Sequence, residues 1–154
     1  MLVPRTLIFL TRGDEVLLLK GAAGKRLWAG MYNGIGGHVE AGEDILSAAR
    51  RELKEETGIV PADLWLCGMV SVDTQTNPGV CIFVFRGEYP GGNMADSSEG
   101  SLEWVKAGEV EKLPKVQDLE ALLTRVLGMK AIDKPFSAHS RYNSAGEMEV
   151  SFAR

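Results

Sequence analysis

The chain has 154 residues, of which 45% are apolar and 25% charged, and its formal net charge at pH 7 is −4. This composition is typical of a globular protein, and the length suits one domain with a substantial core. The negative charge argues against a nucleic-acid polymer as the main partner. The apolar run at residues 7–10 is far too short for a signal sequence or a membrane span. We therefore expect a single cytoplasmic domain over residues 1–154, with no membrane partner.

The first part of the chain predicts a β-hairpin, a loop and a glycine-dense turn. Thr6–Thr11 and Val16–Lys20 are short aliphatic runs separated by a turn sequence. The loop at residues 21–32 is either a plain surface loop or one that faces a substrate. Residues 33–38, Asn-Gly-Ile-Gly-Gly-His, predict a tight turn whose backbone can approach a metal or a phosphate closely.

The segment from Gly37 to Ile59 predicts an amphipathic helix of about three turns. Ile45, Ala49 and Leu53 form an apolar stripe that would anchor the helix on a sheet. Gly58 is suited to the left-handed conformation that ends many helices.

The rest of the chain predicts strands, one further helix and a closing hairpin. The hydrophobic spacing from Leu119 to about Leu127 indicates the helix, which Gly128 can end. The strands are predicted at Leu64–Val72, Val80–Glu88, Leu102–Val105, Phe136–Tyr142 and Glu147–Phe152. Cys67 and Cys81 both lie in apolar runs, so we expect reduced core thiols. The predicted architecture is a mixed β-sheet between helices.

Three glutamates at the end of the first helix are the strongest chemical signal. Glu52, Glu55 and Glu56 stand at i, i+3 and i+4, so they share one helix face and repel one another. A cluster of oxygen ligands at this spacing is explained by a divalent cation such as Mg²⁺. Arg51 lies four residues before Glu55 and can hold that carboxylate in place. The alternative is a solvated acidic face balanced by neighbouring basic residues.

The whole stretch resembles the signature of the Nudix hydrolases. Gly37, Glu43 and the run at residues 51–59, Arg-Glu-Leu-Lys-Glu-Glu-Thr-Gly-Ile, match that signature at every fixed position. The resemblance implies an α+β fold, an α/β/α sandwich, and a metal-dependent hydrolase of a nucleoside diphosphate linked to another group. The approach at residues 32–38 is similar to that of the MutT-type 8-oxo-dGTP diphosphatases, as are Ser98-Glu99 before Trp104 and the ending Phe136…His139…Tyr142.

Two positions differ from other branches of the family, which also favours the MutT-type branch. Gln75 stands where ADP-ribose hydrolases commonly have a proline, and Thr76 stands near where diadenosine-polyphosphate hydrolases have a tyrosine.

The resemblance implies a set of site residues. Mg²⁺, with Mn²⁺ as an alternative, would be held by the Gly36 carbonyl and by Glu52, Glu55, Glu56 and Glu99. The implied catalytic residues are Arg51 and a general base, either Glu52 or Glu55. The implied substrate contacts are Thr6, Asn33, Gly37, His38 and Asp118. Glu99 has the alternative of being a plain surface glutamate, and Asp118 that of being the N-cap of the second helix.

The expected function is Mg²⁺-dependent hydrolysis of oxidised purine nucleoside triphosphates such as 8-oxo-dGTP, giving the monophosphate and pyrophosphate. Such a reaction cleans the nucleotide pool. One alternative is a broader pyrophosphohydrolase acting on dinucleotides or pterin triphosphate, and another is an inactive module that senses nucleotides. The expected partner is a small nucleotide, and the expected assembly is a monomer or homodimer.

Overall fold

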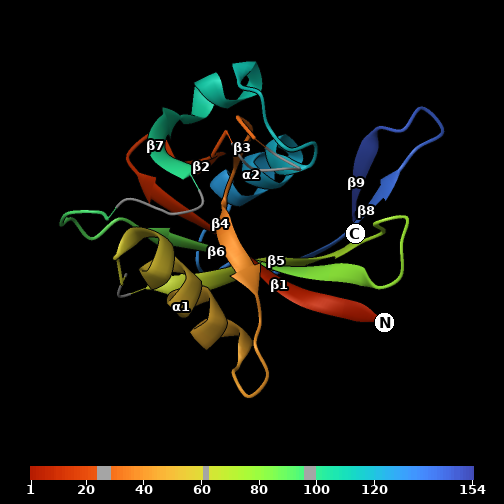
Figure 1. Ribbon diagram of the computed structural model, residues 1–154, viewed down its shortest axis with the longest axis horizontal. Coiled ribbons are helices and arrows are strands. Elements are labelled where there is room, and N and C mark those ends of the chain that lie inside the picture. The colour runs from red at the N-terminus through yellow and green to blue at the C-terminus, as the bar shows by residue number, and fades with distance from the viewer. Residues whose placement is uncertain (24–28, 61–62, 96–99) are drawn as a thin grey trace.

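Strand β1 (Leu2–Arg12) lies inside the sheet and is covered on both faces. Leu7 and Phe9 are buried on one face, and Ile8 and Leu10 on the other. The computed structural model in Figure 1 describes residues 1–23, 29–60, 63–95 and 100–154. Within these residues one mixed sheet of nine strands contains β1.

The strands neighbouring β1 set the geometry of the site. On one edge β1 pairs in parallel with β6 (Gly79–Glu88). On the other edge its end pairs with β2 (Glu15–Gly21), and its beginning pairs with β4 (Ile35–His38). The strand order is β3-β2-β1-β6-β5-β8-β9, with β7 paired to β2. The remaining strands are β3 (Tyr32–Asn33), β5 (Leu64–Val72), β7 (Gly100–Lys106), β8 (Phe136–Tyr142) and β9 (Met148–Phe152).

One helix covers each face of the sheet (Figure 1). Helix α1 (Ile45–Thr57) packs its buried Ala49 and Leu53 in the cluster that contains Ile8 and Leu10. Helix α2 (Leu119–Leu127) packs on the opposite face, in the cluster that contains Leu7 and Phe9. The predicted α/β/α sandwich is confirmed.

The glycine-dense segment before α1 differs from its prediction, because it forms the short strands β3 and β4 rather than a turn. The reason is the closeness of two backbones. A Cβ at Gly36 would lie 1.9 Å from the carbonyl oxygen of Thr6, so β4 can pair with β1 there only without a side chain. The structure also has a 3₁₀ helix, η1 (Ala107–Lys112), that the hydrophobic pattern did not predict.

Both cysteines are free thiols, as predicted, but only Cys67 lies in the core, and Cys81 is partly buried. Burial raises the pKa of Cys67 to about 12, and burial also raises the pKa of Cys81. Neither thiol is therefore activated as a nucleophile at neutral pH. In the described ranges, no helix is both long enough and apolar enough to cross a membrane.

Candidate active site

Local interactions fix both ends of α1, which carries the acidic residues. Asp44 caps the first turn, because its side chain accepts hydrogen bonds from the backbone N–H of Ser47 at 2.8 Å and from the Ser47 hydroxyl at 2.7 Å. Gly58 ends the helix with a φ of 76° and donates its N–H to the carbonyl of Lys54. The helix is therefore a rigid support for its glutamates.

A cavity of about 690 Å³ brings α1 together with the opposite face of the sheet. This volume lies in the usual range for small-molecule sites. All five predicted substrate contacts line it: Thr6, Asn33, Gly37, His38 and Asp118. Three predicted metal ligands also line it: Gly36, Glu52 and Glu56. Its apolar lining residues are aliphatic: Leu7, Leu19, Val72, Val80, Ile82 and Val116.

Glu52 is enclosed, with only 13% of its side chain exposed, compared with 56% for Glu55. Burial raises its pKa, while the neighbouring guanidinium of Arg51 opposes that shift. Its carboxylate lies against the backbone of Gly37, where a Cβ would come within 2.3 Å of Oε1. Gly37 therefore leaves room for a carboxylate at the cavity wall.

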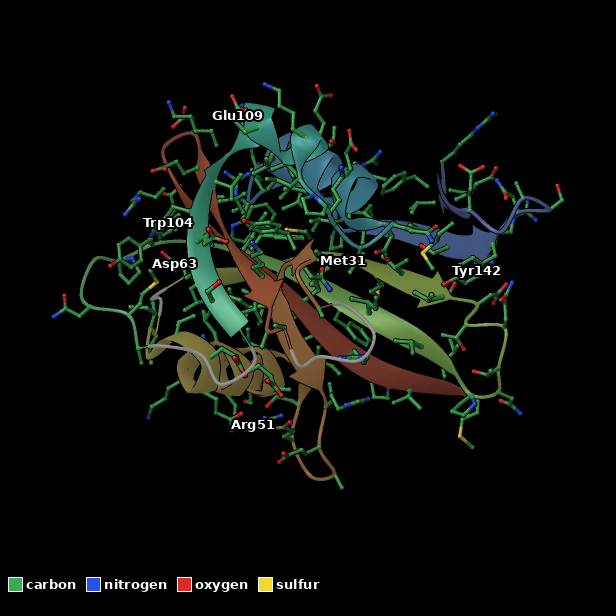
Figure 2. All side chains as sticks on the ribbon, turned by 45° about the horizontal axis from the view of Figure 1, so that its top comes forward. Met31, Arg51, Asp63, Trp104, Glu109 and Tyr142 are labelled. Carbon is green, nitrogen blue, oxygen red and sulfur yellow. The ribbon has the colours of Figure 1, made fainter. Side chains whose placement is uncertain are left out.

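Arg51, which is labelled in Figure 2, is the centre of an ion-pair network with glutamates of α1 and of the loop before it. It donates to Glu43 at 2.7 Å, to Glu52 at 3.0 Å and to Glu55 at 3.3 Å. Its Nη2 also donates to the backbone carbonyl of His38 at 3.0 Å. The hydrogen bond from Arg51 lowers the pKa of Glu43, and the hydrogen bonds to Glu43 and Glu52 raise the pKa of Arg51. Arg51 thus ties α1 to the end of β4 and is not itself part of the cavity wall.

The three helix glutamates do not converge equally, which corrects the prediction from their spacing. Glu52 and Glu56 line the cavity, whereas the Glu55 side chain is 56% exposed and bonded to Arg51. In the described part of the chain, no three Asp, Glu, His or Cys side chains form a ready-made metal cluster. The fifth predicted ligand, Glu99, lies outside the described residues.

The donor chemistry at the cavity nevertheless suits Mg²⁺. Carboxylate and carbonyl oxygens, as in Glu52, Glu56 and Gly36, are the ligands that this ion prefers. Glu52 is a partly buried carboxylate beside two other glutamates, and its charge would be stabilised by a cation in the cavity.

Asp118 faces the cavity rather than capping its helix. It occupies the N-cap position of α2, but its side chain makes no capping hydrogen bond and its backbone is already in the helical region, at φ −93° and ψ −5°. The capping alternative is therefore wrong. Burial raises the pKa of Asp118. A partly buried carboxyl group that is not used for capping is a candidate for ligand recognition.

Asn33 is held in one orientation by its own backbone. Its Oδ1 accepts the N–H of Gly34 at 2.8 Å. An amide oxygen has two acceptor positions, so one remains after this bond, as do both N–H donors of the amide group.

The sequence did not point to Arg5, which also lines the cavity. It shares a strand face with Leu7 and Phe9, and a charge at this spacing in an apolar strand was the available signal. Only the pairing of β1 with β4 shows that this charge reaches the site.

Comparisons with known proteins agree with this geometry. The family model for the NUDIX domain matches residues 1–126. An oxidized purine nucleoside triphosphate hydrolase from Danio rerio is 33% identical over 110 residues, covering 71% of this chain and 67% of the relative. The NAD-capped RNA hydrolase NudC of Stutzerimonas stutzeri (strain A1501) is 27% identical over 136 residues, covering 87% of this chain. The chain spans only 47% of that relative's length.

A solved structure extends the match to almost the full chain. The MutT protein from Bacillus halodurans superposes with a TM-score of 0.81 at 29% identity, covering 98% of this chain and 97% of that one. A mixed sheet between helices, with acidic residues carried to a cavity wall by a capped helix, defines a protein with the MutT-type fold. The chain belongs to the Nudix hydrolase family.

Proposed function

We propose that the protein hydrolyses purine nucleoside triphosphates, with oxidised forms such as 8-oxo-dGTP preferred, to the monophosphate and pyrophosphate. The observation that carries this proposal is the single cavity that Glu52 and Glu56 share with Asn33 and Asp118. The acidic residues suit a metal–polyphosphate complex, and the Asn–Asp pair suits a purine base. The similarity to the oxidized purine nucleoside triphosphate hydrolase of Danio rerio supports the same substrate class.

At the phosphate end of the cavity, the chain supplies metal ligands and a general base. Mg²⁺, held by Glu52, Glu56 and the Gly36 carbonyl, would neutralise phosphate oxygens and act as a Lewis acid. Of the two candidate general bases, Glu52 lines the cavity and Glu55 does not. We therefore assign Glu52 to receive the proton of the attacking water. Arg51 fixes the orientation of Glu52 through their 3.0 Å hydrogen bond.

At the end of the cavity proposed for the purine, Asp118 and Asn33 provide complementary hydrogen-bonding groups. The Asp118 carboxylate would accept hydrogen bonds from the N1 and N2 edge of guanine. The Asn33 amide would donate to O6 and accept at position 7 through the free acceptor position of Oδ1.

Position 7 is where oxidation changes the base. Oxidation at C8 converts N7 from an acceptor into an N–H donor, which Oδ1 of Asn33 can accept. Ordinary guanine presents a lone pair to the same oxygen. A buried polar group left unpaired costs about 1–3 kcal/mol, which corresponds to roughly ten- to a hundredfold discrimination.

The test is steady-state hydrolysis of 8-oxo-dGTP and dGTP with Mg²⁺, with pyrophosphate and monophosphate both quantified. We expect a higher kcat/KM for 8-oxo-dGTP, reduced toward parity in Asn33→Ala. Equal values for both nucleotides in the unmodified protein would rule out this base pocket. Absence of turnover with either nucleotide would support a binding module instead.

A second candidate is a broader pyrophosphohydrolase. The lining of the cavity favours it, because no Phe, Tyr or Trp ring from the described residues is present to stack on a particular base. A panel that includes dinucleotides and a pterin triphosphate distinguishes the two functions. The narrower proposal requires 8-oxo-dGTP to have the highest kcat/KM in that panel.

A further inference from the structure

Arg5 lies at the part of the cavity wall where β1, β4 and β6 meet. It is directly opposite His38 on β4 and opposite Ile82 on β6, and all three residues line the cavity. Residues opposite each other on neighbouring strands point to the same face, so the guanidinium projects beside His38. The next residue along β4, Gly37, contacts the Glu52 carboxylate. Neighbouring residues on a strand point to opposite faces, so Arg5 and the Glu52 carboxylate line the same cavity from the two sides of β4.

Apart from Arg5 and His38, the acidic and basic side chains that line the cavity are carboxylates, within the described residues. The carboxylates lining the cavity are Glu40, Glu52, Glu56 and Asp118, and within the described ranges Arg5 is the one Lys or Arg among the lining residues. Arg51, the nearby arginine of α1, is already bonded to Glu43, Glu52 and Glu55.

The guanidinium of Arg5 differs from that of Arg51 in its bonding. Its side chain is exposed at the cavity, and it forms no hydrogen bond or ion pair with any residue that the structure describes. Its donors are therefore available to a ligand in the cavity. A guanidinium group presents a planar set of donors that matches a phosphate group with two parallel hydrogen bonds.

We propose that Arg5 binds a phosphate group of the nucleoside polyphosphate and thereby offsets the repulsion between the substrate and the acidic wall. This inference rests on the proposed function for the class of ligand. Arg5 acts in substrate binding and takes no proton in the reaction.

The kinetic test compares Arg5→Ala, Arg5→Lys and a matched control, Arg50→Ala. Arg50 is also an exposed arginine, but it lies on α1 and lines a different cavity. Loss of a hydrogen bond to a charged group predicts a rise of about tenfold in the KM for 8-oxo-dGTP in Arg5→Ala, with little change in kcat. Arg5→Lys should recover part of the affinity, and Arg50→Ala should behave as the unmodified protein.

A salt series adds a readout that a purely structural role would not change. Raising NaCl screens the attraction between Arg5 and the phosphates, and Arg5→Ala lacks that attraction, so the ratio of kcat/KM in the unmodified protein to that in Arg5→Ala should fall toward one as NaCl is raised. Equal salt dependence in the two proteins, or an unchanged KM, would overturn the inference while leaving the proposed reaction intact.

Calorimetric binding separates this inference from the proposed function. With dGTP and deoxyguanosine as ligands, Arg5→Ala should weaken the binding of dGTP and leave that of the nucleoside unchanged. An equal loss for both ligands would show that Arg5 stacks on the base and would overturn the inference. Weakened dGTP binding in a protein without turnover would support the role of Arg5 and refute the proposed reaction. A protein that binds neither ligand would refute both.

Discussion

The Glu52 carboxylate occupies the space that a side chain at Gly37 would need. A Cβ on Gly37 would lie 2.3 Å from Oε1 and 2.8 Å from Oε2 of Glu52. The end of β4 and the third turn of α1 are therefore in direct contact, and the contact sets the position of a carboxylate at the cavity wall.

Gly37→Ala should displace Glu52 and reduce kcat strongly, because a shift of about 1 Å in a reacting group can cost on the order of a hundredfold in rate. Steady-state kinetics with circular dichroism measures this effect and checks that the fold is retained. Gly108→Ala is the matched control, since a Cβ there meets nothing within 4 Å. Wild-type kcat in a folded Gly37→Ala protein would contradict the role of this contact.

Glu56→Gln should weaken Mg²⁺ binding and abolish turnover while preserving the fold. The substitution removes a charge from the cavity wall, and the buried residues Ala49 and Leu53 that anchor α1 are untouched. Calorimetric titration with Mg²⁺ and a hydrolysis assay test the two effects separately. Glu111→Gln, on the exposed surface of η1, serves as the control. A Glu56→Gln protein that hydrolyses triphosphates at the wild-type rate would refute the metal assignment.

Arg51→Ala should lower both Tm and activity, because Glu43, Glu52 and Glu55 would lose their shared cation. The repulsion among these carboxylates should be relieved in part by added Mg²⁺, so the loss of Tm should be smaller with the ion present. Thermal unfolding with and without Mg²⁺ measures this difference. Arg51→Lys should be intermediate, since an ammonium cannot reproduce the forked contacts of a guanidinium. An unchanged Tm in Arg51→Ala would show that the network does not stabilise the fold.

Activity should rise with pH through the neutral range and be greatest on the alkaline side. Burial raises the pKa of Glu52, so a higher pH is needed to keep this carboxylate ionised as a general base. Metal binding also requires ionised carboxylates. A pH profile of kcat/KM at saturating Mg²⁺ tests the prediction, and a sharp optimum below about pH 6 would contradict it.

Asp118→Asn should stabilise the fold while removing guanine selectivity. Because burial raises the folded-state pKa of Asp118 above its unfolded value, its contribution to stability is present at low pH and is lost as pH rises through the folded-state pKa. Asparagine avoids this loss, so the Tm gain should be largest at neutral pH and should disappear below about pH 3–4. Each 1 kcal/mol recovered corresponds to a Tm change of about 2–4 °C at this chain length.

Melting curves between pH 3 and pH 8 measure the gain, and the exposed Asp63→Asn is the control. A Tm difference that does not vary with pH would show that the charge of Asp118 is not the cause.

The sequence by itself determined the elements whose causes are local. Helix α1 could be predicted because its apolar stripe, its acidic face and its terminal Gly58 are all set by near neighbours in the chain. The strands at Leu64–Val72 and Phe136–Tyr142 were predicted with the bounds that the structure has, since a short alternating or apolar run between turn residues suffices. The family also followed from spacing within one continuous segment.

Only the tertiary structure decided which distant residues share the cavity. Asp118 has an N-cap position by sequence, yet it lines the same cavity as Asn33 and Glu52, because α2 packs on the sheet beside that cavity. Likewise, Arg5 reaches the site through the register of β1 with β4, and Arg51 gathers carboxylates from the loop before α1 as well as from the helix itself. The physical reason is that a side chain's neighbours across a sheet depend on strand register and packing, which join residues far apart in the chain.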